Sequence, residues 1–228
     1  MTSAQDNERA DSALANLQAQ FDIVRSEVEI AGRTLTIDRP RSADDLISDE
    51  DFDRDERLPY WADVWPSSIA LAERLVGEAG AGRRLLELGA GIGLVSAIAA
   101  WRGFEVTATD YYAEALEFTR HNTFRNGERL PVTRLVDWRD FPHDLGRFDI
   151  VVASDVLYER PYADLVGAAF AATLEHDGFG ILTDPQRQNG ALFPEACQRH
   201  RLTITHKTGI SVNHGATAQT IDLYELRF

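Results

Sequence analysis

The chain has 228 residues, enough for one sizeable hydrophobic core, and its 44% hydrophobic and 26% charged residues are ordinary for a globular protein. Its formal net charge of −14 disfavours nucleic acid as a partner, because an acidic surface repels phosphate backbones. No apolar run approaches the roughly 20 residues of a membrane span, Met1–Gln20 is too polar for a signal peptide, and the single Cys197 allows no internal disulfide. We therefore expect a cytoplasmic protein with no membrane partner. The histidines lack the paired spacing of metal ligands, so we expect no metal site.

Residues 1–58 are predicted to form an extension ahead of the main domain. Residues 5–20 have a weak helical pattern. Apolar and polar residues alternate in Phe21–Ile30 and Arg33–Ile37, on either side of Ala31-Gly32, which predicts a β-hairpin. Eight acidic residues lie between positions 44 and 56, and we expect them to form a mobile acidic segment.

Residues 59–228 are predicted to form the main domain, in which helices and strands alternate. Pro66 marks the start of the first helix, Pro66–Val76. Periodicity then predicts strands at Arg84–Leu88, Glu105–Thr109, Val132–Val136, Phe148–Ala153 and Gly178–Thr183, with helices near 92–102, 112–125, 161–174 and 191–200. This alternation indicates a mostly parallel sheet with helices on both faces.

The chain ends in two predicted strands, Leu202–Lys207 and Thr220–Phe228. No helix separates them, so they must be antiparallel, because a parallel pair needs a crossover of a dozen or more residues. In the last strand, Ile221 and Leu223 lie on one face and Tyr224 lies on the other, so we expect both faces to be covered. The predicted fold class is α/β: a Rossmann-like, seven-stranded, mostly parallel sheet with an antiparallel last strand and an N-terminal hairpin and helical extension.

The first strand of the main domain runs into a glycine turn and then into a helix. Gly89, Gly91 and Gly93 give this turn a G-x-G-x-G spacing. Such a turn lets a ligand press against bare backbone at the start of a helix. The dinucleotide fingerprint would place its third glycine at position 94, which is Leu94. This difference, together with Glu87 before the first glycine, favours S-adenosylmethionine (SAM) over NAD.

In this architecture, Glu87–Gly93 resembles motif I of the class I, seven-strand SAM-dependent methyltransferases. The resemblance implies that the turn binds the methionine and ribose parts of SAM, which leaves as S-adenosylhomocysteine. It implies that Asp110, at the end of the second strand, accepts hydrogen bonds from the ribose hydroxyls. It also implies that Asp137 and Trp138 contact the adenine, with Tyr111 as a second candidate for the adenine face. Plain packing remains an alternative for Trp138.

A D-x-x-Y motif, Asp155 to Tyr158, follows the fourth strand and resembles the group of protein-lysine methyltransferases known as family 16. That group includes the electron-transfer flavoprotein β-subunit and chaperone lysine methyltransferases. The resemblance implies that Asp155 and Tyr158 are catalytic, and that Ser154 and Trp65 line the cofactor site. The alternatives are that Asp155 caps the next helix, and that the Trp-rich stretch 59–67 anchors the N-terminal hairpin.

A further stretch, Asp184-Pro185-Gln186-Arg187, is similar to a D-P-G-R turn in the flavoprotein-specific members of that group. Gln186 replaces the glycine here, so the chain departs from the narrower pattern. The assignment therefore stays at the level of the family and does not extend to a particular substrate.

The predicted function is SAM-dependent methylation of a protein side-chain nitrogen, with lysine as the expected target. A free lysine amine has a pKa of ~10.4, so roughly one in 2,500 is neutral at pH 7. A nearby carboxylate raises that pKa, so we expect Asp155 to orient the amine rather than act as a simple base. Histidine or arginine targets, a small-molecule N- or O-methyltransferase and a non-catalytic SAM-binding protein remain alternatives. The sequence leaves the oligomeric state open.

Overall fold

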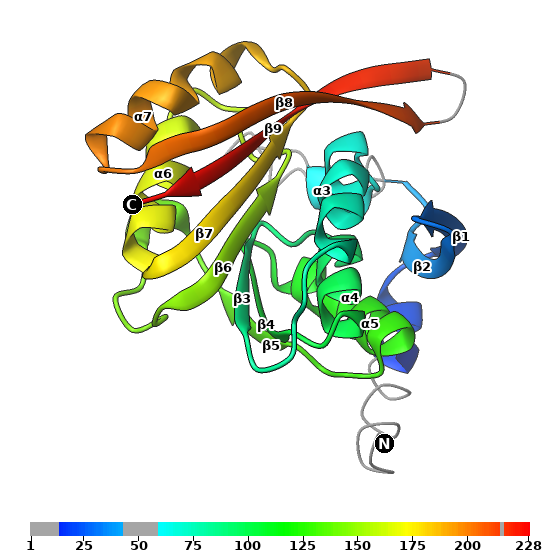
Figure 1. Cartoon of the computed structure of the whole chain (residues 1–228). Helices are drawn as coiled ribbons and strands as arrows, with labels where there is room; N and C mark the ends of the chain where they lie inside the picture. Colours follow the sequence, from blue (N-terminus) through cyan, green and yellow to red (C-terminus); the bar gives the residue numbers. More distant parts are fainter. Residues whose placement is uncertain (1–13, 43–58, 215–216) are drawn as a thin grey trace, which may run out of the picture.

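The computed structural model describes residues 14–42, 59–214 and 217–228, and its largest element is a seven-stranded sheet (Figure 1). The strands are ordered β5-β4-β3-β6-β7-β9-β8. Their bounds are β3 Arg84–Leu88, β4 Glu105–Asp110, β5 Val132–Leu135, β6 Phe148–Ser154, β7 Leu174–Asp184, β8 Thr203–His214 and β9 Thr217–Arg227.

One strand of this sheet runs against the others. The pairs β3–β4, β3–β6, β4–β5 and β6–β7 are parallel, whereas β9 is antiparallel to both β7 and β8. The predicted α/β class and antiparallel last strand are therefore confirmed. Parallel strands end at a common edge, so the carboxyl ends of β3, β4 and β6 meet there, as ligand sites in open α/β sheets require.

Helices cover both faces of the sheet (Figure 1). Helices α3 Pro66–Val76, α4 Leu94–Trp101 and α5 Ala113–Gly127 lie on one side, and α6 Tyr162–Thr173 and α7 Phe193–Arg199 lie on the other. Short 3-10 helices occur at Tyr60–Ala62, Trp138–Asp140 and Gln188–Leu192. Ile221 and Leu223 of β9 pack with the first layer and Tyr224 with the second, so both faces of this strand are covered, as predicted.

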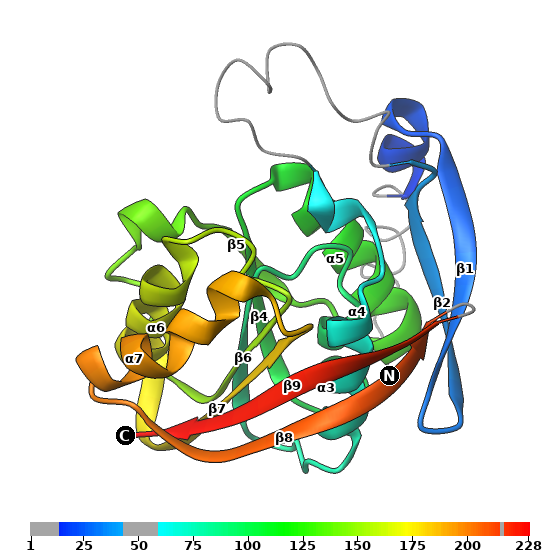
Figure 2. The same ribbon diagram turned by 90° about the horizontal axis from the view of Figure 1, so that it is seen from above.

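The predicted N-terminal hairpin is present as β1 Ile23–Ile30 and β2 Arg33–Pro40, and it stands beside α5 (Figure 2). Its turn residues Ala31 and Gly32 both have positive φ, 48° and 79°. This geometry is typical of two-residue hairpins, because it matches the twist of the strands. Residues 14–20, directly before the hairpin, are helical.

Two asparagines of α5 hold the outer edge of β2. Asn122 bonds through its amide to the N–H and C=O of Asp38, at 2.9 and 2.8 Å, and Asn126 does the same for Thr36, at 3.0 and 2.9 Å. A side-chain amide offers one donor and one acceptor side by side, so it replaces a neighbouring strand. The hairpin thereby becomes a fixed part of the α3–α5 layer, and its Ile30, Leu35 and Ile37 are fully buried in that core.

The structure differs from the sequence prediction at several boundaries. Helix α4 begins at Leu94, because the three glycines of the preceding turn all have positive φ, which no helix tolerates. Strands β8 and β9 are longer than predicted. The acidic residues 44–56 and the first part of the weak helix lie outside the described residues, and the division at residue 58 stays a prediction. In the part of the chain that the structure describes, no helix is long and apolar enough to cross a membrane.

Candidate active site

A cavity of about 550 Å³ lies at the carboxyl ends of β3, β4 and β6. This volume is within the range of roughly 300–1,000 Å³ that small-molecule sites occupy. The cavity is lined by eleven of the twelve predicted site residues: Trp65, Glu87, Gly89, Gly91, Asp110, Tyr111, Asp137, Trp138, Ser154, Asp155 and Tyr158. The fold therefore brings together residues that are up to 93 positions apart in the sequence, from Trp65 to Tyr158.

The twelfth residue, Gly93, does not line the cavity. It precedes α4 with φ 85°, and a Cβ at this position would lie 2.6 Å from Cα of Thr119. Gly93 thus lets α4 and α5 pack closely. Gly89 and Gly91 differ, because a Cβ on Gly89 would lie 3.0 Å from Cγ1 of Val156 and one on Gly91 would lie 3.1 Å from the carbonyl oxygen of Trp61. These two glycines keep the wall of the cavity as bare backbone.

Glu87 lies in β3 and is buried against the first turn of α4. Its carboxylate accepts hydrogen bonds from the hydroxyl and the backbone N–H of Ser96, in the first turn of that helix. Burial raises the pKa of Glu87 to about 8, against the hydrogen bonds from Ser96, so the group is mostly protonated at pH 7. A cation placed in the cavity would favour its ionised form.

Asp110 connects the end of β4 to the glycine turn. Its Oδ2 accepts the N–H of Gly91 at 2.9 Å, and its Oδ1 accepts the N–H of Tyr112 at 3.0 Å. Burial raises the pKa of Asp110, although these backbone N–H groups oppose the shift. A carboxylate offers about four lone-pair sites, so Asp110 keeps acceptor capacity for a diol in the cavity.

Asp137 and its neighbours form the far wall. Asp137 caps the 3-10 helix Trp138–Asp140 by accepting the N–H of Arg139 at 2.9 Å, and it also pairs with the guanidinium of Arg139 at 2.7 Å. The same guanidinium lies 5.8 Å from the ring centroid of Tyr111. Asp137 therefore lines the place predicted for the adenine while paired with Arg139, which does not itself line the cavity.

A row of aromatic rings crosses the cavity. Ring centroids are 6.1 Å apart for Trp65 and Tyr60, 5.5 Å for Tyr60 and Tyr158, 5.0 Å for Tyr158 and Tyr162, and 5.3 Å for Tyr162 and Trp138. Tyr60 and Tyr162 were not predicted as site residues, although Tyr60 belongs to the Trp-rich stretch. Burial raises the pKa of the Tyr158 phenol, so it keeps its proton and acts as a donor.

Asp155 follows β6 with a positive φ of 57°, which Asp tolerates better than most residues. Its Oδ1 accepts Nε of Arg187 at 2.7 Å, and its Oδ2 has no hydrogen-bond partner among the described residues. Burial raises the pKa of Asp155, and the charge and hydrogen bond of Arg187, together with the nearby hydroxyl of Ser67, oppose that shift. Asp155 does not cap α6, whose N-cap is Pro161 without a side-chain bond.

Arg187 is a further residue of the site that the sequence analysis did not predict. It lines the same cavity and comes from the turn after β7, 32 positions beyond Asp155. The sequence signal for this residue was the similarity of Asp184–Arg187 to a D-P-G-R turn. That similarity did not indicate that the arginine side chain pairs with Asp155. The turn is fixed by Asp184, whose Oδ1 accepts the N–H of Arg187 at 2.8 Å.

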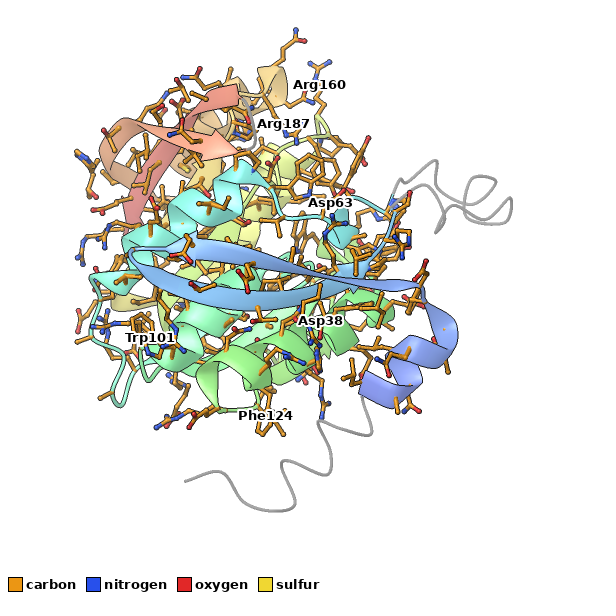
Figure 3. All side chains as sticks on the ribbon, turned by 90° about the vertical axis from the view of Figure 1, so that its right-hand side faces the viewer. Asp38, Asp63, Trp101, Phe124, Arg160 and Arg187 are labelled. Carbon is orange, nitrogen blue, oxygen red and sulfur yellow. The ribbon has the colours of Figure 1, made fainter. Side chains whose placement is uncertain are left out.

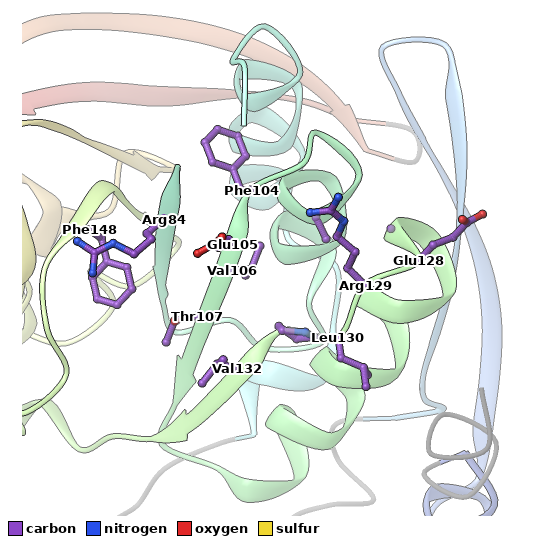
Figure 4. Close-up of a pocket in the computed structure, with 13 residues that line it drawn as sticks. Arg84, Phe104, Glu105, Val106, Thr107, Glu128, Arg129, Leu130, Val132 and Phe148 are labelled. Carbon is purple, nitrogen blue, oxygen red and sulfur yellow. The ribbon is translucent and has the colours of Figure 1, made fainter. Parts of the chain in front are cut away.

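A second cavity, of about 810 Å³, lies at the opposite edge of the sheet, where β3, β4 and β5 begin (Figure 4). Its labelled residues include Arg84, Glu105 and Arg129, and none of the predicted site residues lines it. Ligands of open α/β sheets bind at the carboxyl ends of the strands, so we place the chemistry in the first cavity. Within the residues that the structure describes, no group of three His, Cys, Asp or Glu side chains is arranged to hold a metal ion.

Comparison with known proteins gives a match to the family model described as lysine methyltransferase, over residues 53–189. Protein-lysine methyltransferase METTL21E of Mus musculus is 35% identical over 118 residues, which cover 46% of this chain and 48% of that protein. EEF1A lysine methyltransferase 3 of Mus musculus is 34% identical over 128 residues, covering 53% and 52%. The chain thus spans about half the length of these curated relatives.

Among solved structures, the 16S rRNA N2 G1207 methyltransferase RsmC of T. thermophilus, in complex with AdoMet and guanosine, has a TM-score of 0.59 to this chain. The two are 20% identical, and the alignment covers 89% of this chain and 50% of that one. At this identity the likeness concerns the fold alone.

Proposed function

The chain belongs to the lysine methyltransferase family, and we propose that it is a SAM-dependent enzyme that methylates a lysine side chain of a protein. The observation that carries the proposal is Oδ2 of Asp155, a buried carboxylate oxygen without a partner among the described residues. It lines the cavity that also contains the glycine turn and Asp110. A buried acceptor without a partner is costly, so it marks the place where a substrate donor would bind.

The residues of the cavity fit SAM. Gly89 and Gly91 provide bare backbone at the start of α4, Asp110 has acceptor capacity for the ribose hydroxyls, and Asp137 with Trp138 forms a polar and aromatic edge for the adenine. When bound, SAM supplies a methyl group on a positively charged sulfur. Glu87 would become ionised more readily beside that charge.

The pair of Asp155 and Arg187 suits a lysine target. The amine must lose its proton before it attacks the methyl group, and an isolated carboxylate would oppose this by raising the pKa of the amine. Arg187 offsets the charge of Asp155, so Oδ2 orients the amine while the local charge stays near zero. The amine proton leaves to water. The π face of Tyr158 would stabilise the methylated ammonium by cation–π attraction.

We further propose that the protein acts in the cytoplasm on protein substrates and not on nucleic acid. The net charge of −14 supports the second point. A small-molecule N- or O-methyltransferase is the competing function, because the fold alone accommodates both. A SAM-binding protein without catalysis is the third possibility.

The test is transfer from labelled SAM in an extract of cells that lack this protein, followed by mass spectrometry of the labelled species. We expect label on lysine in a protein band. Label only in small molecules would contradict the protein substrate. Calorimetric SAM binding without transfer to any extract would favour the non-catalytic alternative, and binding of NAD in place of SAM would overturn the cofactor.

A further inference from the structure

Two hollows on one face connect the active-site cavity with the N-terminal hairpin. The inner hollow, of about 520 Å³, shares four residues with the active-site cavity: Asp63, Trp65, Asp155 and Arg187. The outer hollow is a groove of about 460 Å³, and it shares Asp63 and Val64 with the inner one. In Figure 3, Asp63 lies at the segment leading into α3, between the blue hairpin and Arg187. The hollows therefore adjoin one another and mark a path from Asp155 toward the hairpin.

The walls of the outer groove are two strand edges. Consecutive residues of β1, Ser26–Glu29, and of β8, Ser211–Asn213, line it. Successive side chains of a strand point to opposite faces, so a run of consecutive residues lines one groove only where the strand turns its edge toward it. Among the described strands, β1 pairs only with β2 and β8 only with β9. The outer ends of β8 and β9 reach past α3 toward the hairpin (Figure 2).

The groove is acidic. Its charged lining residues are Glu27, Glu29, Asp63, Glu73 and Arg39, which gives four negative charges and one positive charge. Arg39 is already paired with Asp63, at 3.1 Å. Glu27 and Glu73 are exposed and have no ion-pair partner among the described residues. The charge of this groove is therefore complementary to a basic ligand.

We propose that the groove between β1 and β8 binds an extended, basic segment of the protein substrate, and that the target lysine reaches Asp155 through the inner hollow. The main chain of the segment would pair with a free strand edge, as in other cases of strand addition, and its basic side chains would face Glu27 and Glu73. At the inner end of the path, the Asp155 side chain is only 5% exposed and its Oδ2 lacks a partner among the described residues. The inference rests on the proposed function for the identity of the target group, but the docking itself does not require catalysis.

Fluorescence anisotropy of the full chain with a dye-labelled synthetic peptide tests the docking. The peptide has about ten residues, is rich in β-branched residues that favour an extended strand, and has a central lysine flanked by arginines. A second peptide has glutamates in place of the arginines. We expect the basic peptide to bind and the acidic one not to bind. The double variant Glu27→Lys/Glu73→Lys should weaken binding of the basic peptide about tenfold, since two attractions become two repulsions.

The matched control is Glu105→Lys/Asp177→Lys. It makes the same charge change on exposed residues in the first halves of β4 and β7, away from the carboxyl ends of the strands. It should leave peptide affinity unchanged. Equal weakening by both double variants would show that binding follows net charge, and would overturn the groove. No binding of the basic peptide by the parent chain would overturn it as well.

The strand-edge component has its own test. A basic peptide that is N-methylated at alternate residues cannot donate its main-chain N–H groups along one edge, so two such peptides with opposite alternation report on the two edges. We expect at least one of them to bind about tenfold more weakly. Unchanged binding of both would refute strand addition. Peptide binding without methyl transfer, while calorimetry still shows SAM binding, would support the groove and contradict the proposed function.

Discussion

Arg187 donates through Nε to Oδ1 of Asp155 at 2.7 Å, so the buried carboxylate that is proposed to face the target amine is already neutralised on one side. The Asp155 side chain is 5% exposed and that of Arg187 is 34% exposed. A carboxylate alone would hold a lysine amine in its unreactive charged form. In the proposed mechanism the pair resolves this conflict, because Oδ2 would orient the amine while Arg187 would oppose its protonation.

The first prediction concerns Arg187. In Arg187→Gln, the positive charge beside Asp155 is lost, so the pKa of the bound lysine amine rises. The pH profile of kcat, which reports on the enzyme–substrate complex, should move toward higher pH by about one unit, with a lower rate at pH 7. The control is Arg160→Gln. Arg160 is an exposed arginine five positions after Asp155 that does not line the cavity. A profile that keeps its midpoint in the Arg187 variant would return this arginine to a structural role.

The second prediction separates catalysis from cofactor binding at Asp155. Asn tolerates the positive φ of this position and keeps the size of the side chain, so Asp155→Asn should fold normally. Transfer should fall on the order of 10- to 100-fold or more, because a charged hydrogen bond to the amine is lost. The dissociation constant of SAM, measured by calorimetry, should stay nearly unchanged. Activity equal to the parent would remove Asp155 from the reaction.

The third prediction concerns Asp110. Because its carboxylate holds the N–H groups of Gly91 and Tyr112, Asp110→Ala should both loosen the glycine turn and remove the ribose acceptor. SAM affinity should fall roughly 10- to 100-fold. Asp110→Asn keeps one oxygen for the turn, so its loss of SAM affinity should lie in the smaller part of that range. If neither variant changes SAM affinity, the ribose does not bind here.

The fourth prediction concerns a proton. The pKa of Glu87 is raised to about 8, so at pH 7 most empty molecules carry a proton on this group. The positive charge of SAM should lower that pKa, so binding releases a proton into solution. Calorimetry in buffers of different ionisation enthalpy measures this release. Glu87→Gln should abolish the Glu87 share of it, while any share from the amino group of SAM remains in both proteins. Identical release by parent and variant would contradict the assignment.

Hydrophobic periodicity predicted most of the fold, whereas the roles expected for the site residues came from the resemblance to a methyltransferase family. The glycine turn and Asp155 directly follow β3 and β6, and Asp110 is the last residue of β4, so hydrophobic periodicity and turn residues were sufficient to place them at the carboxyl ends of these strands. Gly93 shows the limit of motif reasoning. Its spacing fits the cofactor turn, but its backbone is needed for the close approach of Thr119, a contact between α4 and α5 that no local pattern encodes.

Contacts distant in sequence account for what was missed. Arg187 reaches Asp155 across 32 positions, and Asn122 reaches Asp38 across 84. Both depend on where β7 and α5 lie in the finished fold. The groove between β1 and β8 is a still clearer case, because strand edges exist only after the sheets have formed.

The last prediction concerns the buried cluster that ties the hairpin to α5. Asp38 accepts hydrogen bonds from Arg25 at 2.7 Å and from His121 at 2.8 Å, and it is labelled on the hairpin in Figure 3. Burial lowers the pKa of His121, despite Asp38, so the folded state prefers the neutral ring. The unfolded chain therefore binds more protons than the folded one below about pH 6.5, and stability should fall as the pH drops through that value.

Asp38 adds a second loss at lower pH. Although burial opposes its ionisation, the bonds from Arg25 and His121 hold its pKa below the usual range. Its contribution is complete above the unfolded value of about 3.9 and disappears as the pH falls below it. The melting temperature measured between pH 7 and pH 3 should therefore show two successive decreases, and His121→Gln should remove the one at higher pH.

Asp38→Asn should destabilise the protein by about 2–3 kcal/mol at pH 7. The loss is smaller than for a fully buried pair, because the Arg25 side chain is 54% exposed. The exposed acid Asp164, which pairs with Arg199, is the control, and Asp164→Asn should change stability little. A single acid transition, unchanged in both Asp38 and His121 variants, would mean that the hairpin does not depend on this cluster.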